Sequence, residues 1–173
     1  MDVEVSQPIA AELEAVEEAY VDPGFYAALG QIPHIDPPKL LETSPDPDDP
    51  SVVHFKVRYA FGGNLSAAAR SVLDPAKLTW TDTSVLDRAH HEVRFEMVPD
   101  HYADKLRFMG TNSFQSSGNG VTTQIMKATL AVSYPVVGPL VERAIFLGIR
   151  ENLSKEAQIL ASWAAARGSR RPR

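Results

Sequence analysis

Three residues near the C-terminal end of the chain are of types that could serve chemistry. Gly148, Asn152 and Glu156 follow one another at intervals of four residues, which places them on one side of a helix. The apolar residues Ile145 and Ile149 lie on the same side, so that side is predicted to be buried. A carboxyl group in apolar surroundings has a raised pKa and can act as a general acid or base. An amide can orient a ligand by hydrogen bonds.

Such residues are unfavourable in a packed core. A glycine inside a helix costs about 1 kcal/mol relative to alanine, and an unpaired buried carboxylate costs far more. One interpretation is that the helix covers a cavity, where Gly148 makes room and Asn152 and Glu156 point at a ligand or at water. The alternative is that Gly148 permits close packing and that Glu156 pairs with an arginine or lysine of a neighbouring sheet.

The helix that carries these residues is the longest element that the sequence predicts. Gly138 and Pro139 indicate its start and Gly168 its end, because proline fits the first turn and glycine commonly follows the last. About 28 residues at 1.5 Å each give a length of roughly 40 Å. Its apolar face holds Val141, Ile145, Ile149, Leu153, Ile159, Leu160 and Trp163.

The residues before this helix predict two short helices and a series of strands. Residues 2–7 alternate as a short strand, Pro8 begins a first helix, and Asp22 with Pro23 begins a second helix that ends at Gly30. Further strands are predicted at 39–43, 51–61, 77–87, 91–98, 104–117 and 121–135, with a hairpin turn at 118–120. The elements predict an α+β fold, in which a curved antiparallel sheet of about six to seven strands grips the long helix.

The composition argues against several classes of function. The net charge is −5 and cysteine is absent, so we expect neither a nucleic-acid binder, which would need a basic face, nor a thiolate metal site. The histidines are scattered or adjacent on a strand, and no nucleotide fingerprint is present, so we predict no metal and no cofactor. Because no apolar run of about 18 residues and no leader-like start occur, we expect no transmembrane segment and a cytoplasmic location.

The chain is predicted to form one domain. We expect this domain to span 1–166 and to be followed by a basic disordered tail at 167–173. A basic tail of this kind can make transient contact with an anionic membrane surface. The sequence predicts no oligomeric state.

The order of elements resembles the START-like superfamily, also called SRPBCC or helix-grip proteins, which includes the Bet v 1-type plant proteins. The resemblance covers residues 2–166. The junction "SYPVVGPLVERAI" is similar to an uncharacterised bacterial branch of that superfamily in Pro135, Gly138 and Glu142. The resemblance implies a cavity between sheet and helix that holds a hydrophobic molecule, and enzymatic activity in some members. For Glu142 we expect a structural role, because the helix dipole favours a carboxylate in the first turn.

The predicted ligand-binding residues combine this implied cavity with the alternation of the strands. They are Phe55, Tyr59, Phe95, Phe108, Asn112, Leu130 and Val132 from the strands and Ile145, Gly148, Ile149, Asn152 and Glu156 from the helix. The first hypothesis is a carrier or sensor of a lipid, a sterol-like or a polyketide-like molecule. The second is a cyclase- or hydrolase-type enzyme on an aromatic or polyketide-like substrate, with Glu156 as acid or base and Asp82 among the further polar groups. The third is a protein-interaction module with a filled core, which a cavity below about 300 Å³ would favour.

Overall fold

The computed structural model describes residues 1–32, 36–61 and 66–169 of the chain. The strands are β1 (Asp2–Ile9), β2 (Lys39–Pro45), β3 (Val52–Ala60), β4 (Thr79–Asp87), β5 (Glu92–Pro99), β6 (Leu106–Gly118) and β7 (Val121–Val132). The helices are α1 (Leu13–Tyr20), α2 (Pro23–Leu29), α3 (Ala67–Arg70) and α4 (Gly138–Gly168), with a 3-10 turn, η1, at Pro75–Lys77.

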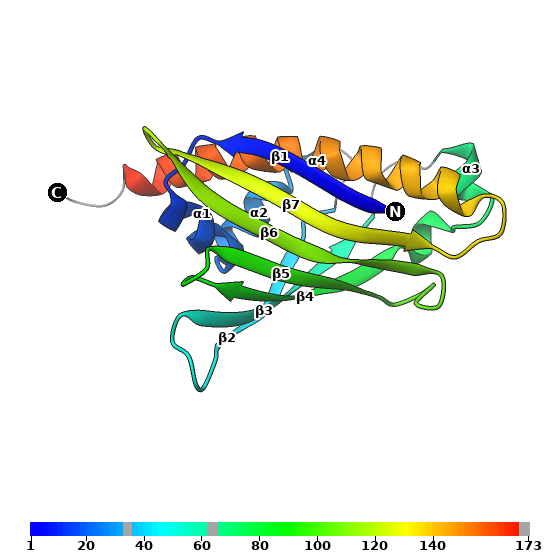
Figure 1. The fold of residues 1–173 in the computed structure, drawn as a ribbon, viewed down its shortest axis with the longest axis horizontal. Helices are drawn as coiled ribbons and strands as arrows, with labels where there is room; N and C mark the ends of the chain where they lie inside the picture. The colour runs from blue at the N-terminus through cyan, green and yellow to red at the C-terminus, as the bar shows by residue number, and fades with distance from the viewer. Residues whose placement is uncertain (33–35, 62–65, 170–173) are drawn as a thin grey trace.

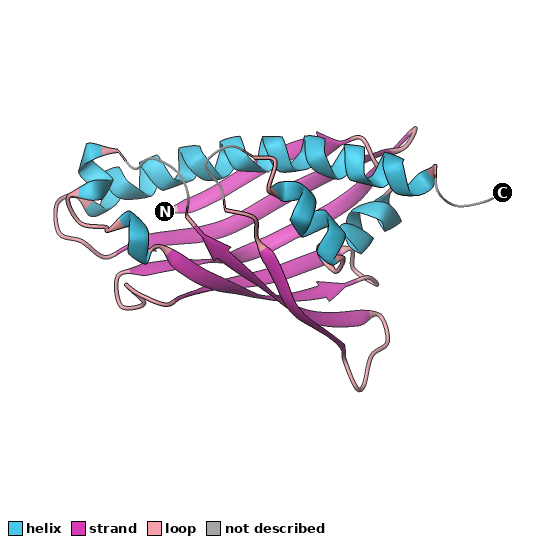
Figure 2. Cartoon of the chain, turned by 180° about the vertical axis from the view of Figure 1, so that it is seen from behind, coloured by secondary structure: helices cyan, strands magenta, loops and turns pink. Residues whose placement is uncertain are grey.

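Within the described residues the strands form one antiparallel sheet of seven strands, in the order β1-β7-β6-β5-β4-β3-β2. The sheet curves, and α4 runs along its length, with α1 and α2 near one end and α3 near the other (Figure 1). Seen from behind, the helices lie together on one face of the sheet (Figure 2). The predicted α+β fold, a curved antiparallel sheet that grips a long C-terminal helix, is confirmed.

The N-terminal segment differs from the prediction. Pro8 does not begin a helix but continues β1, where it pairs with Thr123, and the strand ends only at Ile9. The helix α1 begins at Leu13. The reason is the position of β1 at the edge of the sheet, where a proline without an N–H group is tolerated.

The hairpin between β6 and β7 turns where the sequence predicts. Gly118, Asn119 and Gly120 all have positive φ angles, of 80°, 53° and 72°. Glycine adopts this conformation freely and asparagine tolerates it. This turn joins the two longest strands, which lie side by side next to the edge strand β1 (Figure 1).

The junction between β7 and α4 is tightly packed. The strand ends at Val132 and not, as predicted, at Pro135. The Val132 N–H donates to Glu142 Oε1 at 2.9 Å, which links the end of the strand to the following helix. A Cβ atom at Gly138 would lie 2.5 Å from the Val132 carbonyl oxygen, so only glycine fits there. Glu142 also lies 3.7 Å from the N-terminal amine of Met1. Glu142 therefore makes structural contacts at this junction, but it lies beyond the first turn of α4 and not, as predicted, within it.

The helix α4 packs against three core clusters of the protein. Val141 belongs to a core cluster beside α3, whereas Ala157 and Leu160 belong to the main core with α1 and α2. Between Val141 and Ala157 the structure describes no buried residue on α4. Its central turns carry the half-buried Phe146, Ile149 and Leu153, which pack against a third cluster formed by Val3, Met126 and Ala128.

The helix α4 extends past residue 166, the predicted end of the domain. Arg167 and Gly168, which were expected in the tail, belong to the last turn of α4. The Arg167 guanidinium group pairs with Asp22 and lies 4.7 Å from the centre of the Trp163 ring. The ion pair with Asp22 ties the end of α4 to the start of α2. The remaining arginines of the predicted tail, at 170–173, lie outside the described residues.

Candidate ligand cavity

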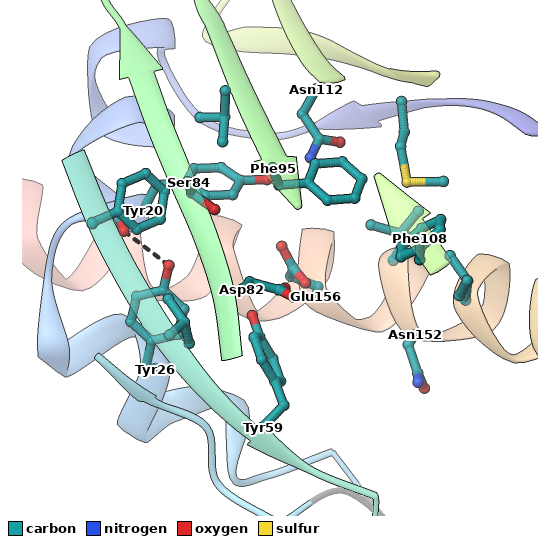
Figure 3. A pocket seen from close by; sticks show the side chains of 16 residues that line it. Tyr20, Tyr26, Tyr59, Asp82, Ser84, Phe95, Phe108, Asn112, Asn152 and Glu156 are labelled. Carbon is teal, nitrogen blue, oxygen red and sulfur yellow. Dashed lines mark hydrogen bonds between the residues drawn. The ribbon is translucent and has the colours of Figure 1, made fainter. Parts of the chain in front are cut away.

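A cavity of about 180 Å³ lies between the curved sheet and the central turns of α4, and it is partly open to solvent (Figure 3). Eight of the predicted ligand-binding residues line it: Phe55, Tyr59, Phe95, Phe108, Asn112, Ile149, Asn152 and Glu156. Asp82, proposed from the sequence as a further polar group, lines it as well. Larger hollows, of about 580 to 620 Å³, lie on the outer surface and are lined mainly by exposed side chains.

The structure places four predicted residues outside the cavity. Leu130 is buried in the sheet, and Val132 and Ile145 pack in the cluster beside α3. Gly148 is exposed, and a Cβ atom there would have no neighbour within 4 Å. The interpretation that Gly148 makes room for a ligand is therefore wrong. Because residues four apart on a helix differ by about 40° in direction, Gly148 points roughly 80° away from Glu156.

Some cavity residues were not among those predicted. Val57 lies on the same strand face as Phe55, and Val93 on the same face as Phe95, so the alternation of the strands could have identified both valines as cavity residues. Tyr20 on α1 and Tyr26 on α2 also line the cavity, and no sequence pattern shows which side of a short helix will meet it. Further lining residues are Ser84, Met126 and Leu153.

Two carboxyl groups face the cavity from different elements, Asp82 from β4 and Glu156 from α4 (Figure 3). Burial raises the pKa of Glu156 to about 7, and the Tyr20 side chain lowers it in part by hydrogen bonding. Burial also raises the pKa of Asp82 to about 7, a hydrogen bond from Trp80 lowers it in part, and the charge of Glu156 raises it further. Asp82 Oδ1 is buried and has no hydrogen-bond partner among the described residues.

Three tyrosines surround this pair of carboxyl groups. Burial and the charge of Glu156 raise the pKa of Tyr20, Tyr26 and Tyr59 well above its ordinary value, so their hydroxyl groups stay neutral. The Tyr26 hydroxyl donates to the Tyr20 carbonyl oxygen at 2.8 Å (Figure 3). The Tyr59 ring stacks on Trp80 with centroids 5.4 Å apart. The rings are therefore held in place before any ligand binds.

A chain of side-chain amides links the cavity wall to α4. Gln124 Nε2 donates to Asn112 Oδ1 at 3.0 Å and to the Tyr20 hydroxyl at 3.1 Å. Gln7 Nε2 donates to Gln124 Oε1 and to the Leu153 carbonyl oxygen, both at 2.8 Å. Buried polar chains of this kind fix the orientation of every member. This chain holds the Tyr20 hydroxyl group in place beside Glu156.

The described residues show no group of three or more His, Cys, Asp or Glu that could hold a metal ion. His90 and His91 have separate partners, Asp87 and Glu17, and His34 lies outside the described residues. Among the described helices, none is both long and apolar enough to cross a membrane.

Comparison with known proteins places the chain in a structural context. Residues 4–164 match a family model described as protein of unknown function (DUF2505). A search of curated proteins found no match.

Solved structures of other proteins share the fold. A START superfamily protein from Mycobacterium smegmatis is 17% identical, with a TM-score of 0.60 over 95% of this chain and 97% of its own. The Zhui aromatase/cyclase from Streptomyces sp. R1128 is 16% identical, with a TM-score of 0.61 over 96% and 94%. Norcoclaurine synthase from Thalictrum flavum is 15% identical, with a TM-score of 0.62 over 95% and 86%. The predicted START-like fold is confirmed.

The cavity volume bears on the three functional hypotheses. At about 180 Å³, the cavity is smaller than the 300 Å³ or so at the lower end of small-molecule sites. Volume alone therefore favours the protein-interaction module over a carrier of large ligands. The polar groups inside the cavity favour a ligand-binding site instead, because a filled core would not leave Asp82 Oδ1 without a partner.

Proposed function

The chain belongs to the family described as protein of unknown function (DUF2505), and we propose that it binds a small, mainly apolar molecule in the cavity beneath α4. One observation carries the proposal. A buried, unpartnered carboxylate oxygen of Asp82 stands in a cavity whose other walls are largely aromatic and aliphatic. An unpaired buried polar atom is unfavourable, and a bound molecule would satisfy it.

The volume limits the size of this molecule. An apolar cavity of about 150 Å³ accommodates benzene, and the cavity here measures about 180 Å³. A single aromatic ring with a short substituent matches this space, whereas a sterol or a long acyl chain exceeds it. The proposal therefore narrows the predicted ligands, which included lipids and sterol-like molecules, to compounds of about one ring.

The binding test uses benzyl alcohol as the probe and two tryptophan variants. Ile149→Trp places a large ring in the cavity wall, whereas Leu147→Trp places the same ring at an exposed position of the same helix. We expect saturable NMR shift changes of cavity residues in the wild type and in Leu147→Trp, and their loss in Ile149→Trp. Equal saturable binding of benzyl alcohol by the two variants would contradict the proposal.

A second candidate function is acid–base catalysis on the bound molecule. It is favoured by the pKa of Glu156, which burial raises to about 7, because a general acid or base works best when its pKa lies near the ambient pH. Phenylacetone, a single-ring ketone, serves as the test substrate. If Glu156 moves protons, the wild type accelerates exchange of the α-protons of phenylacetone for deuterium, and Glu156→Gln binds the ketone without accelerating exchange. Equal exchange in both proteins would remove Glu156 from any such mechanism.

A further inference from the structure

The ionisable side chains that line the cavity are all acids. They come from five elements: Tyr20 on α1, Tyr26 on α2, Tyr59 on β3, Asp82 on β4 and Glu156 on α4. No lysine, arginine or histidine is among the described residues that line it. The wall can therefore become negatively charged, and no cationic side chain of the described wall is there to neutralise that charge.

Proteins usually pair a buried carboxylate with a cation or with several N–H donors. Salt bridges of that kind occur elsewhere in this chain, for instance between Asp100 and Arg58 at the surface and between the buried Glu17 and both Arg88 and His91. In the cavity, by contrast, Asp82 Oδ1 has no partner in the described part of the chain. The missing partner is a hydrogen-bond donor, and a positively charged donor matches this site best.

The remaining walls suit an aromatic cation. Six aromatic side chains line the cavity: Tyr20, Tyr26, Phe55, Tyr59, Phe95 and Phe108. The Phe95 and Phe108 rings lie 5.2 Å apart at an angle of 54°, a favourable arrangement for aromatic pairs. Aromatic faces attract ammonium groups as well as other rings. A metal ion fits less well, because Ca²⁺ takes about six to eight oxygen ligands, and the cavity offers mainly carbon.

We propose that the ligand is a small aromatic or similarly compact amine, whose ammonium group binds between the carboxyl groups of Asp82 and Glu156. This inference rests on the proposed function and names the chemical class of the molecule that the cavity takes. An anionic ligand would face two like charges. A neutral ligand would leave the charges of the two carboxylates uncompensated.

Binding of an amine is then linked to pH. The ammonium group stabilises both carboxylates, so their protons must leave before or during binding. The other titratable groups that face them are the hydroxyls of Tyr20, Tyr26 and Tyr59, and these stay neutral in the same range because burial raises the pKa of each. Affinity for an amine should therefore increase as the pH rises from about 5.5 to 8, whereas affinity for a neutral analogue should change little.

Isothermal titration calorimetry with three probes of one size tests this inference. Benzylamine, benzyl alcohol and benzoate differ in charge but share the ring and nearly the same volume. At about pH 8 we expect benzylamine to bind about tenfold or more tightly than benzyl alcohol, because hydrogen bonds to charged groups are stronger than neutral ones. We expect benzoate not to bind.

Matched variants test whether the preference for benzylamine depends on the two carboxyl groups of the cavity. Asp82→Asn and, independently, Glu156→Gln should weaken benzylamine binding about tenfold while leaving benzyl alcohol binding nearly unchanged. Asp100→Asn, which removes a surface carboxylate from the ion pair with Arg58, is the control and should leave all affinities unchanged. Equal affinity of the wild type for benzylamine and benzyl alcohol would overturn the amine inference but leave the proposed function standing. Absence of binding by all three probes would overturn both.

Discussion

The carboxyl groups of Asp82 and Glu156 face one cavity from the sheet and from α4, and the charge of Glu156 raises the pKa of Asp82. The two groups come from positions 74 residues apart in the sequence. Because burial raises the pKa of each to about 7, each binds a proton in the folded protein at a pH where it would be ionised in the unfolded chain.

The first prediction concerns Asp82→Asn and pH. The folded-state pKa of Asp82, about 7, exceeds the ordinary value of 3.8, so the folded protein binds more protons between these values. The stability that protonation supplies is complete below about pH 4 and is lost as the pH rises toward 7. Removing the charge should raise the free energy of unfolding by about 2 kcal/mol at pH 8, allowing for partial solvent access. Urea denaturation between about pH 5 and 8 measures the difference.

The control for this prediction is Asp100→Asn. Its hydrogen bonds to Arg58 and Thr79 lower the pKa of Asp100 to about 2, so its ionised form stabilises the folded state. The substitution should therefore lower stability slightly at pH 8, with the opposite sign from Asp82→Asn. Equal pH dependence of unfolding in the wild type and in Asp82→Asn would contradict the raised pKa.

The second prediction concerns the contact between Tyr20 and Glu156. The Tyr20 side chain lowers the pKa of Glu156 by hydrogen bonding, so Tyr20→Phe should raise that pKa further above 7. Carbon-detected NMR titration of the Glu156 carboxyl group measures it. Tyr26→Phe is the matched control, because the Tyr26 hydroxyl donates to a backbone carbonyl. An equal shift in both variants would show that Tyr20 does not act through its hydroxyl.

The third prediction compares two glycines of α4. Gly148→Ala should stabilise the protein by about 0.5 to 1 kcal/mol, because alanine favours the helix and its Cβ atom would meet nothing within 4 Å. Gly138→Ala should destabilise it, because a Cβ atom there would lie 2.5 Å from the Val132 carbonyl oxygen. Thermal unfolding of the two variants measures both changes in stability. A loss of stability in Gly148→Ala would restore the view that this glycine makes room for something.

The fourth prediction concerns a buried carboxylate outside the cavity. Glu17 is 3% exposed and lies 2.8 Å from His91 Nδ1 and 3.5 Å from Arg88 Nη1. Arg88→Ala should lower the free energy of unfolding by about 2 kcal/mol, because it leaves a buried charge with one partner fewer. Arg94→Ala, at an exposed position of β5, should change stability by less than about 0.5 kcal/mol. Similar losses in both variants would contradict a special role for the Glu17 pair.

Much of the fold could be predicted because its signals are local. The Asp22 side chain caps α2 by accepting a hydrogen bond from the Gly24 N–H at 2.7 Å, and Pro23 lies in the first turn. Both residue types are typical of a helix start. Pro8 was misassigned because the same residue type suits a helix start and an edge strand. Whether β1 lies at an edge depends on its pairing with β7, which local sequence does not contain.

Cavity residues could be predicted where the periodicity of a strand or helix determines which way a side chain points. They could not be predicted where the packing of one element against another determines it. Alternation placed Phe55, Tyr59 and Phe95 on one face of the sheet, and all three line the cavity. On α4 the spacing of four residues misplaced Gly148, because its small angular drift accumulates over two steps. Tyr20 was not predicted as a cavity residue. Its approach to Glu156 depends on how α1 docks against the end of the sheet.

The most direct test of the account is a crystal structure of the protein with benzylamine at about pH 8, at about ten times the dissociation constant found by calorimetry. We expect the benzylamine ring in the cavity beneath α4, against Phe95 and Phe108, with the amine nitrogen within hydrogen-bond distance of both Asp82 and Glu156. A cavity that holds only water under these conditions, or one closed by the side chains of α4, would contradict it.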